Sequence, residues 1–484
     1  MELHELTIKE ASDKLASNEL SAKELTESLL ARAKSLNPKL NAYLAFTEDR
    51  AFSDASAADQ AIADGTNLPL TGIPFAVKDN ILIKGIQATA ASKILKNYKA
   101  TYTASSMTRV MEQLPVLLGK TNLDEFAMGS STENSAFGPT HNPFDLERVP
   151  GGSSGGSAVA VASGSALFAF GTDTGGSVRQ PAAFCGIVGL KPTYGRISRY
   201  GLIAMGSSLD QLGIMAKTVE DVALVCQTVA GQDEWDSTTL PIPVPDYQQA
   251  MQRENLKGFK IGIPKEYFTE GMDKEVEASV KAAIKKLEEL GAVVEEVSLP
   301  HTKYSLSSYY IIMPVEVSAN LARYDGIRYG LSAAGETLED VYLNSRSEGF
   351  GAEPKRRIMI GTYASSAGYA DQYYKKAKQA QKLIRKDFVE VFKKYDLLVT
   401  PTTPTTAFKL GERSQDPLSM YLADIFTVAL NIAGVPGLAM PVGVSSQGLP
   451  IGMQLIGPHF GEDKLFAAGR VIERALNLKI KPKL

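Results

Sequence analysis

Two blocks rich in glycine and serine stand out in the chain, Gly151-Gly-Ser-Ser-Gly-Gly-Ser157 and Gly171-Thr-Asp-Thr-Gly-Gly-Ser-Val-Arg179. Glycine lets the backbone turn tightly and approach a ligand closely, so successive N–H groups can converge on one anionic point. Such loops bind either a phosphate or an oxyanion. A flexible linker has a similar composition, but the apolar runs Ala158–Ala162 and Leu167–Phe170 flank the blocks closely, which is unusual for linkers.

The common phosphate loops do not fit this sequence. The run Gly119–Thr121 resembles the end of a P-loop, but Leu114 occupies the position of its first glycine, and no Gly-x-Gly-x-x-Gly opens a helix after a strand. The segment Gly151–Gly155 matches a nucleophile elbow, which needs a strand directly before it. Residues 142–150 are turn-like and end in proline, so an α/β-hydrolase is a minor alternative.

A serine nucleophile needs a base, and histidine is sparse. A Ser-His-Asp triad would have to recruit the distant His301 or His459. Lys78 ends the apolar run that starts at Gly72, which predicts a short buried strand. Burial lowers the pKa of a lysine toward neutrality, so that it can take a proton from serine. A lone lysine at a strand end is more often solvated, but the serine loops favour the catalytic interpretation.

Helical and strand patterns alternate along the chain. Capping boxes at Thr7 and Ser21 predict two opening helices, and an alanine-rich helix is expected around 54–63. The alternation indicates a mixed α/β sheet. We predict strands at 116–118, 167–170, 187–190, 260–263, 293–297 and 397–399, and helices at 219–229, 274–290 and 369–394.

The length of 484 residues would allow about three domains of roughly 150 residues each. No linker or internal repeat divides the chain, and the proline-rich 233–247 is expected to be a loop. We therefore predict one domain, 1–484. Its parts are a helical N-terminal region (1–66), a core with the serine loops (67–230), and the remaining sheet, helices and pocket elements (231–484).

Composition excludes several functions. The 51 basic and 54 acidic residues give a net charge of −3, so no overall basic field exists to hold a phosphate backbone. Cys185 and Cys226 are too few for a disulfide framework or a zinc site, and we expect no metal or cofactor in this chain. The acidic start lacks the features of a signal peptide, and the apolar 425–444 contains prolines and glycines typical of buried core. A cytoplasmic protein without a membrane contact is expected.

Four segments together resemble the amidase signature family. They are Ala76-Val-Lys-Asp-Asn80, Gly119-Lys-Thr-Asn122, Pro150-Gly-Gly-Ser-Ser-Gly-Gly-Ser157 and Gly171-Thr-Asp-Thr-Gly-Gly-Ser-Val-Arg-Gln-Pro-Ala-Ala-Phe-Cys-Gly186. Further segments, 124–138, 189–196, 323–330 and 355–363, are similar to the branch that serves tRNA-dependent amidotransferases, and the resemblance runs to about Gly457. It implies one large α/β domain with a mixed sheet covered by helices on both faces.

The resemblance also implies a catalytic triad. Ser177 is expected as the nucleophile, Ser153, the cis-serine, as the proton carrier and Lys78 as the base. Backbone N–H groups of Thr174, Gly175, Gly176 and Ser177 are expected to form the oxyanion hole, and Ser154 to orient the other groups. Supporting roles are predicted for Asp173 and Arg179, as a loop-fixing ion pair, and Cys185 is expected to be a small buried hydrophobe.

By the same resemblance the substrate is glutamine, hydrolysed to glutamate and ammonia. Arg357 is expected to bind its carboxylate and Asp424 its ammonium, with Tyr309 or Tyr310 nearby. A partner subunit would bind ATP and Mg and use the ammonia to convert Glu-tRNA(Gln) to Gln-tRNA(Gln). A small third subunit would bridge the two, giving a heterotrimer.

Two alternatives remain at this point. A stand-alone amidase acting on another small amide would purify as a monomer or homo-oligomer. A non-catalytic binding subunit that retains the loops would release no ammonia.

Overall fold

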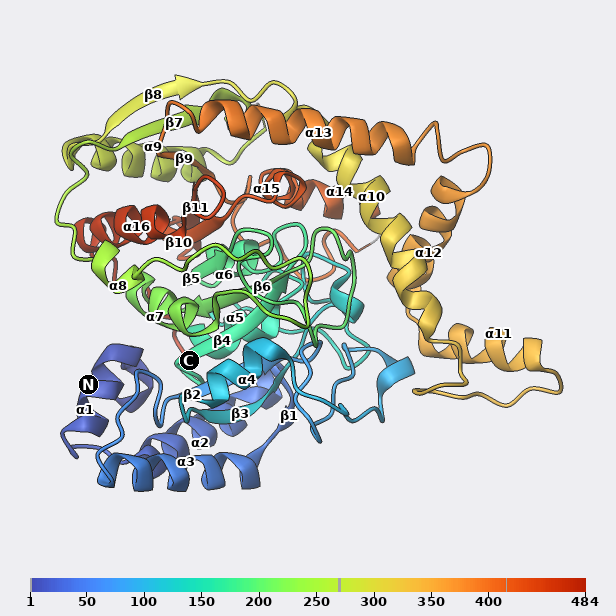
Figure 1. Ribbon diagram of the computed structural model, residues 1–484, viewed down its shortest axis with the longest axis horizontal. Coiled ribbons are helices and arrows are strands. Elements are labelled where there is room, and N and C mark those ends of the chain that lie inside the picture. Colours follow the sequence, from blue (N-terminus) through green and yellow to red (C-terminus); the bar gives the residue numbers. More distant parts are fainter. Residues whose placement is uncertain (1, 269–270, 415) are drawn as a thin grey trace.

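The computed structural model describes residues 2–268, 271–414 and 416–484 (Figure 1). The described strands form one mixed sheet of 11 strands, in which the pairs β2–β3, β2–β4, β7–β8 and β7–β9 are parallel and the others antiparallel. The order across the sheet is β1 (Tyr43–Phe46), β3 (Val116–Thr121), β2 (Pro74–Lys78), β4 (Phe168–Asp173), β6 (Gln211–Ala216), β5 (Val188–Lys191), β10 (Gly437–Val444), β11 (Pro450–Ile456), β9 (Leu397–Pro401), β7 (Lys260–Pro264) and β8 (Val293–Val297). The predicted α/β class with a mixed sheet is confirmed.

Two groups of helices pack along the middle of this sheet, and α2 and α3 contact β3. Helices α4, α7, α8, α16 and α9 follow one another in contact, whereas α5 and α6 contact each other and the central strands. Helices α10, α11 and α12 form an arm that extends away from the sheet (Figure 1). The bounds are α1 (Ile8–Ala16), α2 (Ala22–Leu40), α3 (Glu48–Ala63), α4 (Ser105–Met111), α5 (Gly155–Ala162), α6 (Arg179–Phe184), α7 (Val219–Val229), α8 (Tyr247–Ala250), α9 (Lys274–Glu289), α10 (Ser305–Asn320), α11 (Leu338–Gly349), α12 (Ala352–Ser365), α13 (Tyr374–Val391), α14 (Pro417–Tyr421), α15 (Val428–Ala433) and α16 (Glu462–Leu476).

Local sequence signals explain several of these boundaries. The capping boxes at Thr7 and Ser21 are both formed, and helix α7 has the predicted bounds. Helix α13 begins later than predicted, because residues 367–373 form a turn that includes Gly368, with φ of 88°. None of the helices in the described ranges combines the length and hydropathy needed to cross a bilayer.

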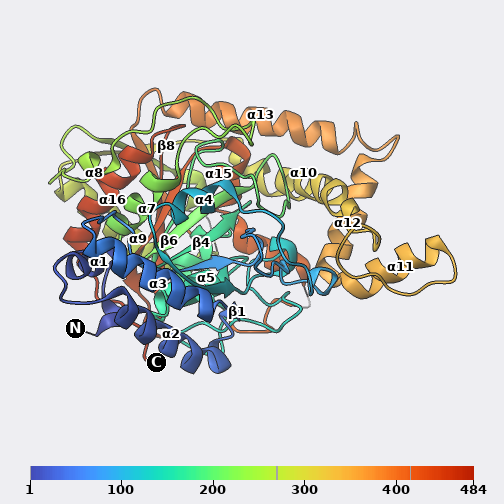
Figure 2. The ribbon, with the colours of Figure 1, turned by 60° about the horizontal axis from the view of Figure 1, so that its bottom comes forward.

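The sheet brings distant segments to one edge. Strands β3, β2 and β4 are parallel neighbours, so their carboxyl ends meet at the same edge, where open α/β sheets bind ligands. Lys78 ends β2, and the loop with Ser177 follows β4 directly. Ser153 precedes α5, which connects β3 to β4. The two ends of the chain lie side by side (Figure 2), and an ion pair of 2.6 Å between Lys481 and Glu5 joins them.

Candidate active site

Lys78 is completely buried among hydroxyl groups. Its Nζ lies 2.8 Å from Ser153 Oγ, 2.8 Å from Ser154 Oγ and 2.9 Å from Thr172 Oγ1. Burial lowers the pKa of Lys78 to about 7, and nearby buried carboxylates oppose this shift only in part. The prediction of a desolvated lysine next to the serines is confirmed.

The loop that carries Ser153 is tightly fixed. The Gly152–Ser153 peptide bond is cis, and Ser153 O accepts a hydrogen bond of 3.2 Å from the N–H of Asp124. A Cβ on Gly152 would lie 2.2 Å from Asp124 Oδ2, so only glycine fits there. The same carboxylate accepts hydrogen bonds from the backbone of Thr132 and Asn134. Asp124 therefore joins the serine loop to the segment before it.

Ser177 lies where the two serine loops meet. Its carbonyl accepts a hydrogen bond of 3.1 Å from the N–H of Ser154, and the residue keeps 9% of its surface exposed. Within the described ranges, Ser177 Oγ makes no hydrogen bond, to Ser153 Oγ or to any other group. Catalytic hydrogen bonds are often long in the absence of substrate, so the open hydroxyl is compatible with a nucleophile.

The predicted oxyanion donors are only partly available. The N–H of Gly176 donates to Asp173 Oδ1 at 2.9 Å, so the expectation that Gly176 serves as a donor is not supported in this arrangement. Among the described residues, the N–H groups of Thr174, Gly175 and Ser177 show no hydrogen bond. These three are the donors left for an oxyanion.

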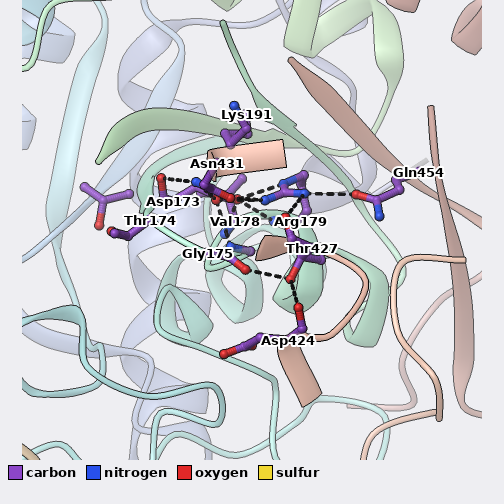
Figure 3. A network of polar contacts seen from close by, with 12 residues as sticks. Asp173, Thr174, Gly175, Val178, Arg179, Lys191, Asp424, Thr427, Asn431 and Gln454 are labelled. Carbon is purple, nitrogen blue, oxygen red and sulfur yellow. Dashed lines mark hydrogen bonds and ion pairs between the residues drawn. The ribbon is translucent and has the colours of Figure 1, made fainter. Parts of the chain in front are cut away.

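Asp173 and Arg179 form a buried ion pair behind the nucleophile loop (Figure 3). Arg179 Nη2 lies 3.0 Å from Asp173 Oδ1, and Asn431 and Gln454 complete the hydrogen bonds of the pair. Burial alone would raise the pKa of Asp173, but the Arg179 guanidinium outweighs it and holds that pKa at about 2. The two residues thus form an ion pair, and its carboxylate also accepts hydrogen bonds from the backbone of Gly176 and Val178 in the loop.

Asp424 is a buried carboxylate close to this loop. Ser130 Oγ lies 2.8 Å from both of its oxygens, and the hydroxyl of Tyr310 donates to Oδ2 at 2.9 Å. Burial raises the pKa of Asp424 to about 7. Thr427 Oγ1 donates to the carbonyls of Gly175, at 2.6 Å, and of Asp424, at 3.1 Å, and so connects the carboxylate to the nucleophile loop (Figure 3).

Arg357 lies buried in α12 on the other side of Tyr310. Its guanidinium carbon is 5.4 Å from the ring centre of Tyr310 and 5.5 Å from that of Tyr421, and its Nε donates to Glu353 at 2.8 Å. The Tyr310 and Tyr421 rings are stacked at 3.9 Å. The structure thus brings the predicted cation and Asp424 to one pair of aromatic rings.

Tyr309 and Tyr310 both belong to the site but contact different parts of it. A Cβ on Gly175 would lie 2.7 Å from Tyr309 Cζ, which places this ring on the nucleophile loop. Tyr310 instead contacts Asp424 and Arg357. The two neighbouring tyrosines therefore occupy different positions in the site, one at the nucleophile loop and one between Asp424 and Arg357.

Several residues that position the site have no predicted role. Ser130 and Asp124 lie in segment 124–138, and Gln180 lies in segment 171–186, both of which resemble the family. The type of a residue does not reveal which distant residue its side chain contacts in the fold. Thr172 has a weaker signal, since it is a single threonine near the end of a mainly apolar buried strand.

The predicted role of Cys185 agrees with its environment. Its thiol is buried, donates to Pro150 O at 3.4 Å, and has a pKa raised by burial, as expected of an inert cysteine. Within the described part of the chain, no group of three or more His, Cys, Asp or Glu side chains is arranged to hold a metal ion.

Comparisons with known proteins agree with this geometry. The profile of the family described as Amidase matches residues 24–466. The glutamyl-tRNA(Gln) amidotransferase subunit designated A from Moorella thermoacetica is 55% identical over 476 residues, which cover 98% of this chain and 97% of the relative. The crystal structure of the corresponding Thermotoga maritima protein has a TM-score of 0.82 at 42% identity and covers 100% and 99% of the two chains. A 6-aminohexanoate cyclic dimer hydrolase, 27% identical, has a TM-score of 0.85 with coverage of 100% and 99%.

Proposed function

The chain belongs to the amidase family, and from this premise we propose that it is the glutaminase subunit of a glutamyl-tRNA(Gln) amidotransferase, which hydrolyses glutamine to glutamate and ammonia. The observation that carries the proposal is the pair of opposite charges at Tyr310: Arg357 lies against its ring and Asp424 accepts its hydroxyl hydrogen. Glutamine carries an α-carboxylate and an α-ammonium group, which these two residues complement. Relatives named for the corresponding subunit match the chain over its full length.

In the proposed first half-reaction, Ser177 Oγ attacks the side-chain amide carbon of glutamine. Its proton passes to the hydroxyl of Ser153, which gives its own proton to neutral Lys78, 2.8 Å away. A pKa of about 7 keeps a large share of Lys78 neutral near physiological pH. The tetrahedral oxyanion takes hydrogen bonds from the N–H groups of Thr174, Gly175 and Ser177, which the loop leaves available.

Collapse of the tetrahedral intermediate reverses the proton path. Lys78 returns its proton through Ser153 to the leaving nitrogen, the C–N bond breaks, and ammonia departs, which leaves a glutamyl ester on Ser177. In the second half-reaction, water gives a proton to Lys78 through Ser153 and attacks the ester; the proton returns to Ser177 Oγ as glutamate leaves. The buried Asp173–Arg179 pair keeps the nucleophile loop in place throughout.

The partner proteins follow from the same proposal. A second subunit binds ATP, Mg and Glu-tRNA(Gln) and uses the ammonia that this chain releases, and a small third subunit bridges the two. The charge of −3 supports this division, because the chain has no overall basic field for tRNA. We place the complex in the cytoplasm and treat residues 1–484 as one domain, since the site draws residues from Lys78 to Asp424.

Two measurements test the proposal. The complex isolated with its partners should release ammonia from glutamine, and Ser177→Ala should abolish this release while the partners still bind. Retained turnover in Ser177→Ala would contradict the catalytic assignment. A stand-alone amidase, the second candidate, would instead be recovered from the native cytoplasm without partner proteins.

A further inference from the structure

Gln180, in the first turn of α6, is completely buried and uses both ends of its side-chain amide. Its Oε1 accepts a hydrogen bond of 2.8 Å from the N–H of Gly152, and its Nε2 donates one of 2.9 Å to Ser130 O. Because one partner is a donor and the other an acceptor, the orientation of the amide is fixed.

The two partners of Gln180 belong to different halves of the site. Gly152 directly precedes Ser153, which contacts Lys78. Ser130 holds the carboxylate of Asp424 through its hydroxyl, at 2.8 Å from each oxygen. One buried amide therefore connects the loop of the proton-carrying serine with the residue that holds the carboxylate.

The packing leaves this connection little room to move. A Cβ on Gly151 would lie 2.6 Å from Gln180 Oε1, so the serine loop runs directly against the amide. A displacement of about 1 Å between a substrate-binding group and the reacting groups can lower a rate by about 10²-fold. The length of the Gln180 side chain thus bears directly on where a bound substrate meets the serines.

We propose that Gln180 is a positioning residue that sets the distance between Asp424 and the Ser153 loop, acting through Ser130. This inference rests on the proposed function, because it takes Asp424 as the group that binds the substrate ammonium. Gln180 touches neither the substrate nor the reacting atoms. It places the amide carbon of an α-amino acid over the serines when the ammonium group is held at Asp424.

The variant Gln180→Glu separates the two bonds of this amide. The glutamate keeps an oxygen that accepts from Gly152, so the serine loop stays in place. Once ionised, its second oxygen replaces the Nε2 donor with an acceptor that faces the carbonyl of Ser130, which must move and carry its hydroxyl away from Asp424. Burial favours the protonated acid, which would still donate, so the variant is compared with the unmodified complex at about pH 9. The variant should therefore affect a substrate only when that substrate uses Asp424.

Two substrates distinguish this effect from a general disturbance. Glutamine has the α-ammonium group, whereas 4-carbamoylbutanoate is the same chain without it. For the complex with Gln180→Glu, we expect kcat/KM for glutamine to fall about 10- to 100-fold, through kcat because the amide carbon is displaced and through KM because Asp424 loses the hydrogen bond from Ser130. In the same variant, kcat/KM for 4-carbamoylbutanoate should stay close to kcat/KM of the unmodified complex for this substrate. Ser130→Ala should reproduce this pattern, and Gln180→Met, which loses both bonds, should lower kcat/KM for both substrates.

Asn37 offers a control with the same hydrogen-bond pattern in a half-buried position. Its amide also accepts from one backbone N–H and donates to one carbonyl, both of Tyr43, at 2.8 and 3.0 Å, between α2 and β1. Asn37→Asp makes the same chemical change outside the site and should leave both substrates unaffected.

The outcomes separate the two proposals. If Gln180→Glu lowers kcat/KM equally for both substrates, or for neither, Gln180 does not position Asp424 and the inference is wrong, while glutamine hydrolysis by the unmodified complex still supports the proposed function. If the unmodified complex releases no ammonia from glutamine, the proposed function itself fails.

Discussion

Replacing Lys78 by methionine should make the protein inactive and at the same time more stable. Lys191 in β5 provides the matched control, because it is also completely buried and burial lowers its pKa to about 7. Among the residues that the structure describes, Lys191 Nζ donates to Pro192 O alone, at 2.8 Å, whereas Lys78 Nζ faces three hydroxyls. The two lysines therefore share complete burial and a pKa lowered to about 7, but they differ in the groups with which they can exchange a proton.

The expected loss of activity follows from the fraction of neutral lysine. At pH 7 a pKa of about 7 leaves about half of Lys78 neutral, whereas the ordinary value of 10.5 would leave only about one molecule in 3,000 neutral. Removing a general base typically lowers the rate by about 10²–10⁴-fold. Lys78→Met should therefore lower the rate of ammonia release by this factor, and Lys191→Met should keep the rate of the unmodified protein.

The expected gain in stability follows from the same shift. The unfolded chain keeps the proton on Lys78 up to about 10.5, but the folded protein releases it above about 7. The buried charge therefore destabilises the fold fully below pH 7, and this penalty disappears as the pH rises from about 7 to 10.5. The shift corresponds to an upper bound of about 5 kcal/mol, so both methionine variants should melt at a higher temperature than the unmodified protein near neutral pH.

Two assays check these expectations. Ammonia release should be measured by a coupled enzymatic assay across about pH 6 to 9, where kcat/KM of the unmodified complex should rise with pH and level off above about 7. Thermal unfolding should be followed at pH 7 and again near pH 9, where the stability gain should shrink. An active Lys78→Met, an inactive Lys191→Met, or a variant at Lys78 that is less stable would refute the reasoning.

Three further substitutions probe the surroundings of the triad. Gly175→Ala places a Cβ 2.7 Å from Tyr309 Cζ, so kcat/KM should fall about 10²-fold with little change in melting temperature; unchanged kinetics would show that the tyrosine can move aside. Arg179→Leu leaves Asp173 buried without its cation and should lower the free energy of unfolding by about 3–5 kcal/mol in chemical denaturation, and a smaller loss would mean that water reaches the carboxylate. Burial raises the pKa of Asp424 to about 7, so KM for glutamine should fall as the pH rises through this value. In Asp424→Asn, KM should be about 10- to 100-fold higher and nearly independent of pH. A pH dependence of KM that persists in this variant would mean that another group causes it.

The sequence predicts those parts of the fold that depend on local chemistry. The capping boxes at Thr7 and Ser21 and the uninterrupted apolar run up to Lys78 depend on neighbouring residues alone, and the structure has a helix or strand where each predicts one. Strand β10 could not be predicted in this way, because it contains glycine and Pro441 and is interrupted by an irregularity between Pro441 and Gly443. Its pairing with β11 and β5 overrides its weak propensity for a strand.

The candidate site divides along a similar line. The triad residues could be named because the serine blocks and the lysine stand in recognisable segments. The hydrogen bonds that position them could not, since Gln180 reaches Ser130, 50 positions away, and Thr427 reaches Gly175 from a different part of the chain. The sequence also could not show whether the N–H of Gly176 is available to an oxyanion, because only the structure reveals that this N–H donates to Asp173.

The central claim is that Ser177 attacks the side-chain amide carbon of glutamine. An electrophilic diazoketone analogue of glutamine, incubated with the complex and followed by peptide mass spectrometry, tests it most directly. We predict inactivation that glutamine protects against, with the analogue attached to Ser177 and no attachment in Ser177→Ala. Inactivation with the label on another residue, such as Ser153 or Cys185, would contradict the account.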